Sequence, residues 1–121
     1  HNCIKNILLN KKITIFGDGK QTRDFIYVQD LVKLIYKSFR LKHGSYNIAS
    51  GKSFSVNQIL NIAKNIDLNL KFNYVKKNLT EVKNVKINNA KIKKFLKINN
   101  SFFTPLNKGI YKTLAWYRKI I

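Results

Sequence analysis

Short strand-like runs alternate with helix-like runs along these 121 residues, and this order predicts an α/β fold. β-Branched and aromatic residues gather in brief runs, whereas elsewhere apolar residues recur at spacings of three and four. The chain has the length of one domain or a piece of one, and its 45% hydrophobic content is enough for a packed core. The strands are too few and too short for a complete doubly wound sheet.

The charge is strongly positive, with 24 basic and 5 acidic residues and a net charge of +19. Only Arg23, Arg40 and Arg118 are arginines, and the lysines are dispersed along the chain, which is typical of a solvated surface. The alternative is a basic nucleic-acid-binding module, whose affinity would fall steeply with salt. Dispersed lysine disfavours nucleic acid as a partner.

Neither a membrane span nor a signal peptide is recognisable, because no apolar run approaches the ~20 residues that a span needs. The single cysteine, Cys3, excludes an intrachain disulfide and fits a reducing compartment. Methionine is absent, so residue 1 is not expected to be a natural start, and we expect the chain to be a fragment.

The first predicted elements are a helix, a strand and a turn. Residues 2–11 place apolar side chains on one helical face, and residues 13–16 form a β-rich run. The sequence Gly17-Asp18-Gly19 then breaks this strand, because glycine supports turn conformations that other residues resist.

A second strand and a helix are predicted next. Residues 23–28 alternate in the manner of a strand, and Asp30 is expected to cap a helix over residues 31–41. His43-Gly44 would end this segment. The side chains that this helix is expected to bury are Leu31, Leu34, Ile35 and Phe39.

The middle of the chain predicts a strand, a helix and another strand. Residues 45–49 form a short β-rich run, and residues 70–75 form another. Between them, Ser55 and Gln58 have the spacing of a capping box, which predicts a helix to about residue 65.

The last third predicts a loop followed by two helices. Residues 76–89 show no clear period, and Asn88 or Asn89 is expected to cap a short helix carrying Ile92, Phe95 and Leu96. Thr104-Pro105 predicts the start of a helix that runs to about residue 118. The side chains that this last helix is expected to bury are Leu106, Ile110, Leu114 and Tyr117.

Arg23 is the strongest candidate for chemistry, because it follows the glycine turn. Its planar guanidinium can bind a phosphate with two hydrogen bonds, and the backbone N–H groups of the turn can add to such a site. The alternative is a surface ion pair of Arg23 with Asp24 or Asp18. The residues alone therefore predict an anion-binding part of an α/β domain.

Other chemistries find little support in the sequence. His1 and His43 lack the companions that a metal site needs, and Cys3 is better interpreted as an apolar residue of a helix face. No Gly-x-Gly-x-x-Gly or Walker pattern is present.

The run from Ile13 to Asp30, ITIFGDGKQTRDFIYVQD, resembles a signature of NAD-dependent nucleotide-sugar epimerases and dehydratases. These enzymes form the extended short-chain dehydrogenase/reductase (SDR) family, which includes UDP-glucose 4-epimerase. The resemblance continues in order through Tyr46–Gly51, Ser55-Val56 and Thr104–Leu106 to Trp116-Tyr117. It implies that residues 1–121 are the C-terminal, substrate-binding portion of an extended Rossmann-type SDR enzyme.

The resemblance also implies roles for individual residues. Arg23 would hold the diphosphate of a nucleotide sugar, with Thr14 and Phe16 lining the base pocket and Gln21 and Phe25 beside them. The family often has an Arg-x-Gly-Asp-like element in a later loop. Here the corresponding run is Asn78-Leu79-Thr80-Glu81, so only the acid Glu81 survives as a candidate substrate contact.

The family's glycine-rich NAD loop and its catalytic Tyr-x-x-x-Lys pair are missing from the chain. The resemblance therefore implies an NAD-dependent enzyme that oxidises the sugar transiently at C4, but the N-terminal Rossmann domain is absent and the chain alone is not expected to catalyse.

We expect a cytoplasmic protein in surface-polysaccharide precursor synthesis. Its partners would be an NDP-sugar, with a UDP-sugar as the leading candidate, and the NAD-binding Rossmann half of the enzyme, on the same chain or on another. A homodimer, which relatives often form, is left open. The further alternative is an inactive gene remnant or a split subunit.

Overall fold

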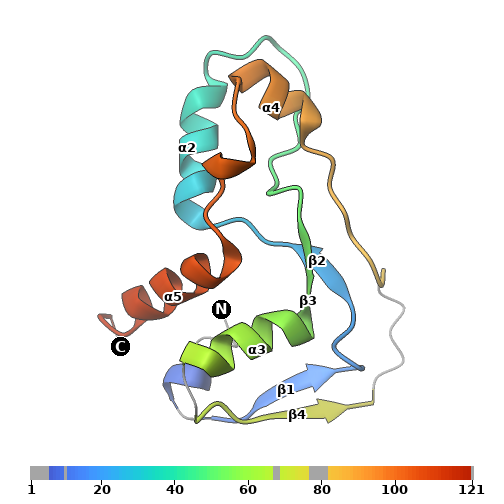
Figure 1. Cartoon of the computed structure of the whole chain (residues 1–121), viewed down its shortest axis with the longest axis vertical. Helices are drawn as coiled ribbons and strands as arrows, with labels where there is room; N and C mark the ends of the chain where they lie inside the picture. Colours follow the sequence, from blue (N-terminus) through green and yellow to red (C-terminus); the bar gives the residue numbers. More distant parts are fainter. Residues whose placement is uncertain (1–5, 10, 67–68, 77–81, 121) are drawn as a thin grey trace.

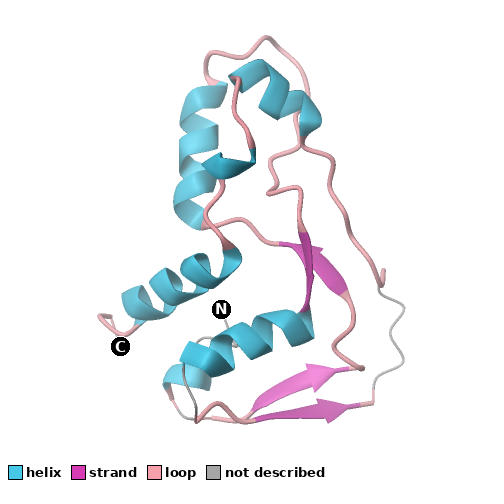
Figure 2. Cartoon of the chain, viewed as in Figure 1, coloured by secondary structure: helices cyan, strands magenta, loops and turns pink. Residues whose placement is uncertain are grey.

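A computed structural model describes residues 6–9, 11–66, 69–76 and 82–120. Residues 6–8 are helical, residues 9 and 11 of the predicted first helix are not, and residues 2–5 and 10 lie outside the described residues. Short strands and helices alternate along the chain (Figures 1 and 2), which confirms the α/β prediction. In order, the elements are β1 Ile13–Phe16, β2 Thr22–Asp24, α2 Val28–Ser38, β3 Ser53–Ser55, α3 Val56–Ile66, β4 Phe72–Val75, α4 Ala90–Leu96, the 3-10 turn η1 Asn100–Phe102 and α5 Leu106–Tyr117.

The strands form two separate pairs. β1 pairs in parallel with β4, with Ile13 opposite Phe72 and Phe16 opposite Val75. β2 pairs antiparallel with β3, with Arg23 opposite Phe54. In Figure 1 helix α3 lies over the β1–β4 pair at one end of the molecule, and α2 and α4 lie at the other end.

The main core lies between α3, α5 and the β1–β4 pair. Ile13 and Ile15 point into it from β1, because alternate residues of a strand face opposite sides. The buried residues of this cluster are Ile7, Ile13, Ile15, Leu60, Ala63, Leu70 and Leu114.

The capping box at the start of α3 is confirmed. The Ser55 amide donates to the Gln58 side-chain oxygen at 2.8 Å, and the Gln58 amide donates to the Ser55 hydroxyl at 3.1 Å. Each side chain therefore satisfies an N–H that has no partner within the helix. The predicted end near residue 65 also agrees with the observed helix, Val56–Ile66.

The second predicted strand is shorter and the following helix earlier than expected. β2 ends at Asp24 because its partner β3 has only three residues, and α2 already begins at Val28. Asp30 therefore lies within the first turn of α2 and is not its cap. Its buried carboxylate accepts a hydrogen bond from the Thr104 amide at 2.6 Å, which ties α2 to the segment before α5.

The predicted strand over residues 45–49 was wrong. No strand of the described residues forms a ladder with this segment, and a strand needs such a partner. Side chains hold the segment instead: Asn47 donates to the Asn88 carbonyl at 3.0 Å and Lys91 donates to the Ser45 carbonyl at 2.9 Å.

The predicted face of α2 is only partly buried. Leu34 is fully buried, but Ile35 is 44% exposed and Phe39, just beyond the helix, is 83% exposed. The helix ends at Ser38, before the predicted end. Periodicity identified the helix but overestimated how much of it the described chain covers.

The two C-terminal helices lie near their predicted positions, with corrections at the caps. The Asn88 side chain accepts from the Ala90 amide at 2.9 Å and so begins α4, in which Ile92 is buried and Phe95 is half exposed. The cap residue of α5 is Pro105, not Thr104, whose amide is used by Asp30. Leu114 is the fully buried apolar residue of α5.

Candidate functional site

The glycine turn between β1 and β2 has a defined backbone geometry. Gly17 and Gly19 have φ angles of +81° and +70°, a region that favours glycine. The Gly17 amide donates to the Val75 carbonyl at 2.9 Å and so extends the β1–β4 ladder. The Lys20 amide donates to the Asp18 carboxylate at 2.9 Å. These two amides are thus already engaged within the fold, which weakens the predicted role of the turn's N–H groups in binding an anion.

Arg23 lies on β2, and backbone carbonyls hold its guanidinium. Its Nη1 donates to the Thr22 carbonyl at 2.8 Å and to the Lys83 carbonyl at 3.5 Å. The segment that supplies the second carbonyl is itself paired with β2: the Thr22 amide donates to the Lys83 carbonyl at 2.9 Å, and the Val85 amide donates to the Thr22 carbonyl at 3.2 Å. The fold therefore presents an oriented cation beside residues 83–85.

The neighbouring acids have contacts of their own. The two carboxylate oxygens of Asp24 accept from the amides of Ser50 and Gly51, each at 2.8 Å. Asp18 lies 4.0 Å from the exposed ammonium of Lys20. Asp24 thus fixes the turn that precedes β3, and this contact orients the β2–β3 pair on which Arg23 lies.

Thr14 and Phe16 share the outer face of β1, opposite the buried Ile13 and Ile15. In the parallel register they face Asn73 and Val75 of β4, and the Thr14 hydroxyl donates to the Asn73 side-chain oxygen at 3.5 Å. This sheet face is open, with Phe16 49% exposed.

Gln21 links that face to β2. Gln21 precedes Arg23 by two residues, and its side-chain nitrogen donates to the Phe16 carbonyl at 3.2 Å. The structure therefore brings Phe16 and Gln21 together at the end of β1, next to the start of the strand that carries Arg23, while Thr14 lies two residues earlier on the same face of β1. Phe25 lies just beyond β2 and is 38% exposed, so the strand predicted over residues 23–28 ends before it. Glu81 lies outside the described residues.

Several polar residues next to these candidates were missed from the sequence. Asn73 could be found only with the β1–β4 register, and Lys83 and Asn84 only with the pairing of their segment to Thr22, whose hydroxyl donates to the Asn84 side chain at 3.2 Å. Asn57 is also close, and it contacts the turn directly. All of these contacts join residues at least 39 positions apart in the chain.

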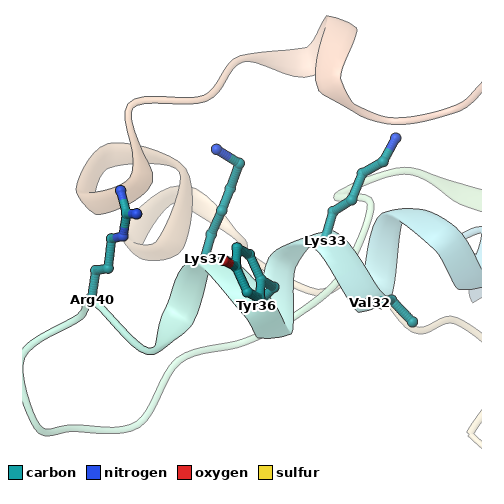
Figure 3. Close-up of a pocket in the computed structure, with 5 residues that line it drawn as sticks. All are labelled: Val32, Lys33, Tyr36, Lys37 and Arg40. Carbon is teal, nitrogen blue, oxygen red and sulfur yellow. The ribbon is translucent and has the colours of Figure 1, made fainter.

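A shallow groove lies elsewhere, on α2 (Figure 3). It has a volume of about 460 Å³ and is lined by Val32, Lys33, Tyr36, Lys37 and Arg40. None of the predicted site residues lines it.

In the described part of the chain, no group of three His, Cys, Asp or Glu residues is arranged to hold a metal ion. No helix of those residues is long and apolar enough to cross a membrane.

Residues 1–116 match the family model described as GDP-mannose 4,6-dehydratase. The chain belongs to the NAD-dependent nucleotide-sugar epimerase/dehydratase family. The family predicted from the Ile13–Asp30 run is thereby confirmed, and members of this family are NAD-dependent epimerases and dehydratases.

One relative in this family is a UDP-glucuronate 4-epimerase of Thermodesulfobacterium geofontis, which is 32% identical to this chain over 121 residues. The match covers 98% of this chain and 37% of that protein. The chain therefore spans well under half the length of this relative.

Solved structures give the same result for the fold. A UDP-glucose 4-epimerase of Thermotoga maritima, solved with UDP-glucose, is 25% identical with a TM-score of 0.88, over 98% of this chain and 38% of that one. A UDP-glucuronic acid 4-epimerase of Bacillus cereus, in complex with UDP-glucuronic acid and NAD, is 25% identical with a TM-score of 0.85, over 100% and 40%. The fold is that of a portion of an extended Rossmann-type SDR enzyme, as predicted.

Proposed function

We propose that this chain binds the nucleotide-diphosphate part of an NDP-sugar within an NAD-dependent epimerase or dehydratase. Among NDP-sugars, a UDP-sugar is the leading candidate. The observation that carries the proposal is the guanidinium of Arg23, which the carbonyls of Thr22 and Lys83 orient at the end of a conformationally fixed glycine turn. An oriented guanidinium suits a diphosphate, because it can form two charge-assisted hydrogen bonds with one phosphate. The two solved relatives bind UDP-glucose and UDP-glucuronic acid, which supports this choice.

The base would lie against the open face of β1 in this proposal. Thr14 and Phe16 are exposed there, and Gln21 closes the end of the strand through its bond to the Phe16 carbonyl. Phe25 remains a candidate neighbour of the base, and Glu81 a candidate contact from the later loop. The proposed setting is surface-polysaccharide precursor synthesis in the cytoplasm.

The residues of this chain do not fit NAD. They contain neither a Gly-x-Gly-x-x-Gly loop for the pyrophosphate nor a Tyr-x-x-x-Lys pair. No redox step is therefore assigned to them, and we expect the 121 residues alone to be catalytically inactive. In the proposal a Rossmann part, supplied in cis or in trans, binds NAD.

An exposed apolar surface on α2 supports the need for such a partner. Its residues recur at helical spacing along one side, and we call them the α2 stripe: Val28, Val32, Ile35, Tyr36 and Phe39. Exposed apolar residues that gather on one side of a helix are typical of an interaction site. In the proposal, the Rossmann part covers it.

Calorimetric titration of the purified chain with UDP and with uridine tests the diphosphate assignment. The Arg23→Ala variant is expected to bind UDP about 10- to 100-fold more weakly, because a hydrogen bond to a charged group contributes about 1.5–3 kcal/mol. Uridine, which has no phosphate, should bind both proteins equally. The matched control is Arg118→Ala, which removes an exposed arginine at the end of α5. Equal UDP affinity of the parent chain and Arg23→Ala would show that Arg23 does not hold the diphosphate.

A further inference from the structure

Asn57, the second residue of α3, joins three elements through one side chain. Its Nδ2 donates to the Asp18 carbonyl in the glycine turn at 3.1 Å. Its Oδ1 accepts from the Tyr74 hydroxyl of β4 at 3.0 Å, and its backbone amide donates to the Gly19 carbonyl at 3.0 Å. The turn is thus fixed from α3 and, through Tyr74, from β4.

Gly19 packs directly against this amide side chain. The residue is buried, and a Cβ built on it would lie 1.9 Å from the Asn57 Oδ1, well inside any allowed contact. Glycine is therefore needed at position 19 both for its φ of +70° and for the close approach of Asn57.

The turn and the start of α3 also satisfy each other's backbone groups. The Val56 amide donates to the Gln21 carbonyl at 3.3 Å, and the Asn57 amide donates to that of Gly19. These helix N–H groups, with that of Gln58, already donate to acceptors within the protein. The start of α3 therefore holds the turn in place and has no N–H group among these three left to bind an anion. The backbone at residues 19 and 21 is thereby set by the helix.

We propose that Asn57, supported by Tyr74, is a positioning residue for the diphosphate site. It fixes the turn from Gly17 to Gln21, and Arg23 follows that turn by two residues on β2. A correctly placed turn sets where the guanidinium lies when a diphosphate arrives. This inference rests on the proposed role of Arg23 and adds the residue that keeps Arg23 in place.

A double-mutant cycle on UDP affinity tests the proposal. Asn57→Ala is expected to weaken UDP binding about tenfold and Tyr74→Phe about threefold, since the latter removes one of the contacts of Asn57. The control is Asn61→Ala, an exposed asparagine one helical turn later, which should leave the affinity unchanged. In an Arg23→Ala background, Asn57→Ala should cause no further loss, because residues that act through one another are not additive.

The outcomes separate this inference from the proposed function. Unchanged affinity in Asn57→Ala, or the same loss in both backgrounds, would overturn the positioning role while Arg23 keeps its own. If UDP does not bind the parent chain, or binds Arg23→Ala equally well, the proposed function fails and the positioning of Arg23 for a diphosphate fails with it. Amide hydrogen exchange then decides whether Asn57 fixes the turn: exchange at Lys20 and Thr22 should accelerate in Asn57→Ala and not in Asn61→Ala, and unchanged exchange would overturn that too.

Discussion

Helices α2 and α3 are both eleven residues long and both have an apolar side, yet their surroundings differ. α3 lies over the β1–β4 pair and against α5, and its residues Leu60 and Ala63 are buried in the core. α2 buries Leu34 and the carboxylate of Asp30, while the α2 stripe remains exposed. Periodicity therefore shows which residues share a helical face, whereas only the rest of the fold shows whether that face is covered.

The largest expected effect contrasts a covered with an uncovered apolar residue. Leu114→Ala should lower the free energy of unfolding by about 2–5 kcal/mol, because it leaves a cavity among α5, α3 and β1. Phe39→Ala, at the 83% exposed end of the α2 stripe, should change it by less than about 0.5 kcal/mol. Urea denaturation measures both, and a similar loss in the two variants would show that α2 is covered in solution.

The anchor of α2 is expected to have the next largest effect. Asp30→Ala leaves the Thr104 amide without its partner and should cost about 1.5–3 kcal/mol of unfolding free energy. Asp30→Asn keeps an accepting oxygen at that place and should cost less. If urea denaturation finds both variants as stable as the parent chain, α2 does not depend on this polar anchor.

A smaller effect is expected at the start of α3. Ser55→Ala removes one half of the capping box and should destabilise the chain by about 1 kcal/mol. α2 has no such cap, because the side chain of its N-cap residue Tyr27 makes no capping hydrogen bond. Urea denaturation, with the helical circular-dichroism signal as readout, distinguishes a lost cap from an inert serine.

The smallest effect on stability is expected on the α2 stripe itself. Val32→Lys combined with Phe39→Lys should change the unfolding free energy by less than about 1 kcal/mol in total, because both side chains are exposed. The same variant should bind less of the dye ANS, which reports exposed apolar surface. Undiminished dye binding would mean that the stripe is not the exposed apolar surface of the chain.

The sequence predicted what local chemistry determines. The capping box of Ser55 and Gln58 needs only two suitable residues three positions apart, and the glycine turn needs only Gly17 and Gly19. The role of Asp30 was missed because its partner Thr104 lies 74 residues away. The predicted strand at residues 45–49 failed for a related reason: a β-rich run becomes a strand only where another strand pairs with it.

The same limit applies to the candidate site. Arg23 could be predicted from its position after a glycine turn and from the family resemblance, whereas the Lys83 carbonyl that orients it comes from a distant segment. Asn57 carried no signal of its own, because an asparagine in the first turn of a helix is ordinary. Its contact with Gly19 appears only when α3 and the turn are placed side by side.

NMR can map the UDP-binding surface directly, through amide chemical-shift changes on titration of the labelled chain with UDP. We expect changes at Phe16, Gln21 and Arg23 and in residues 83–85, with little change along α2. Changes concentrated on Lys33, Lys37 and Arg40, around the groove of α2, would instead rule out a diphosphate site at Arg23 and move the anion site to the other end of the molecule.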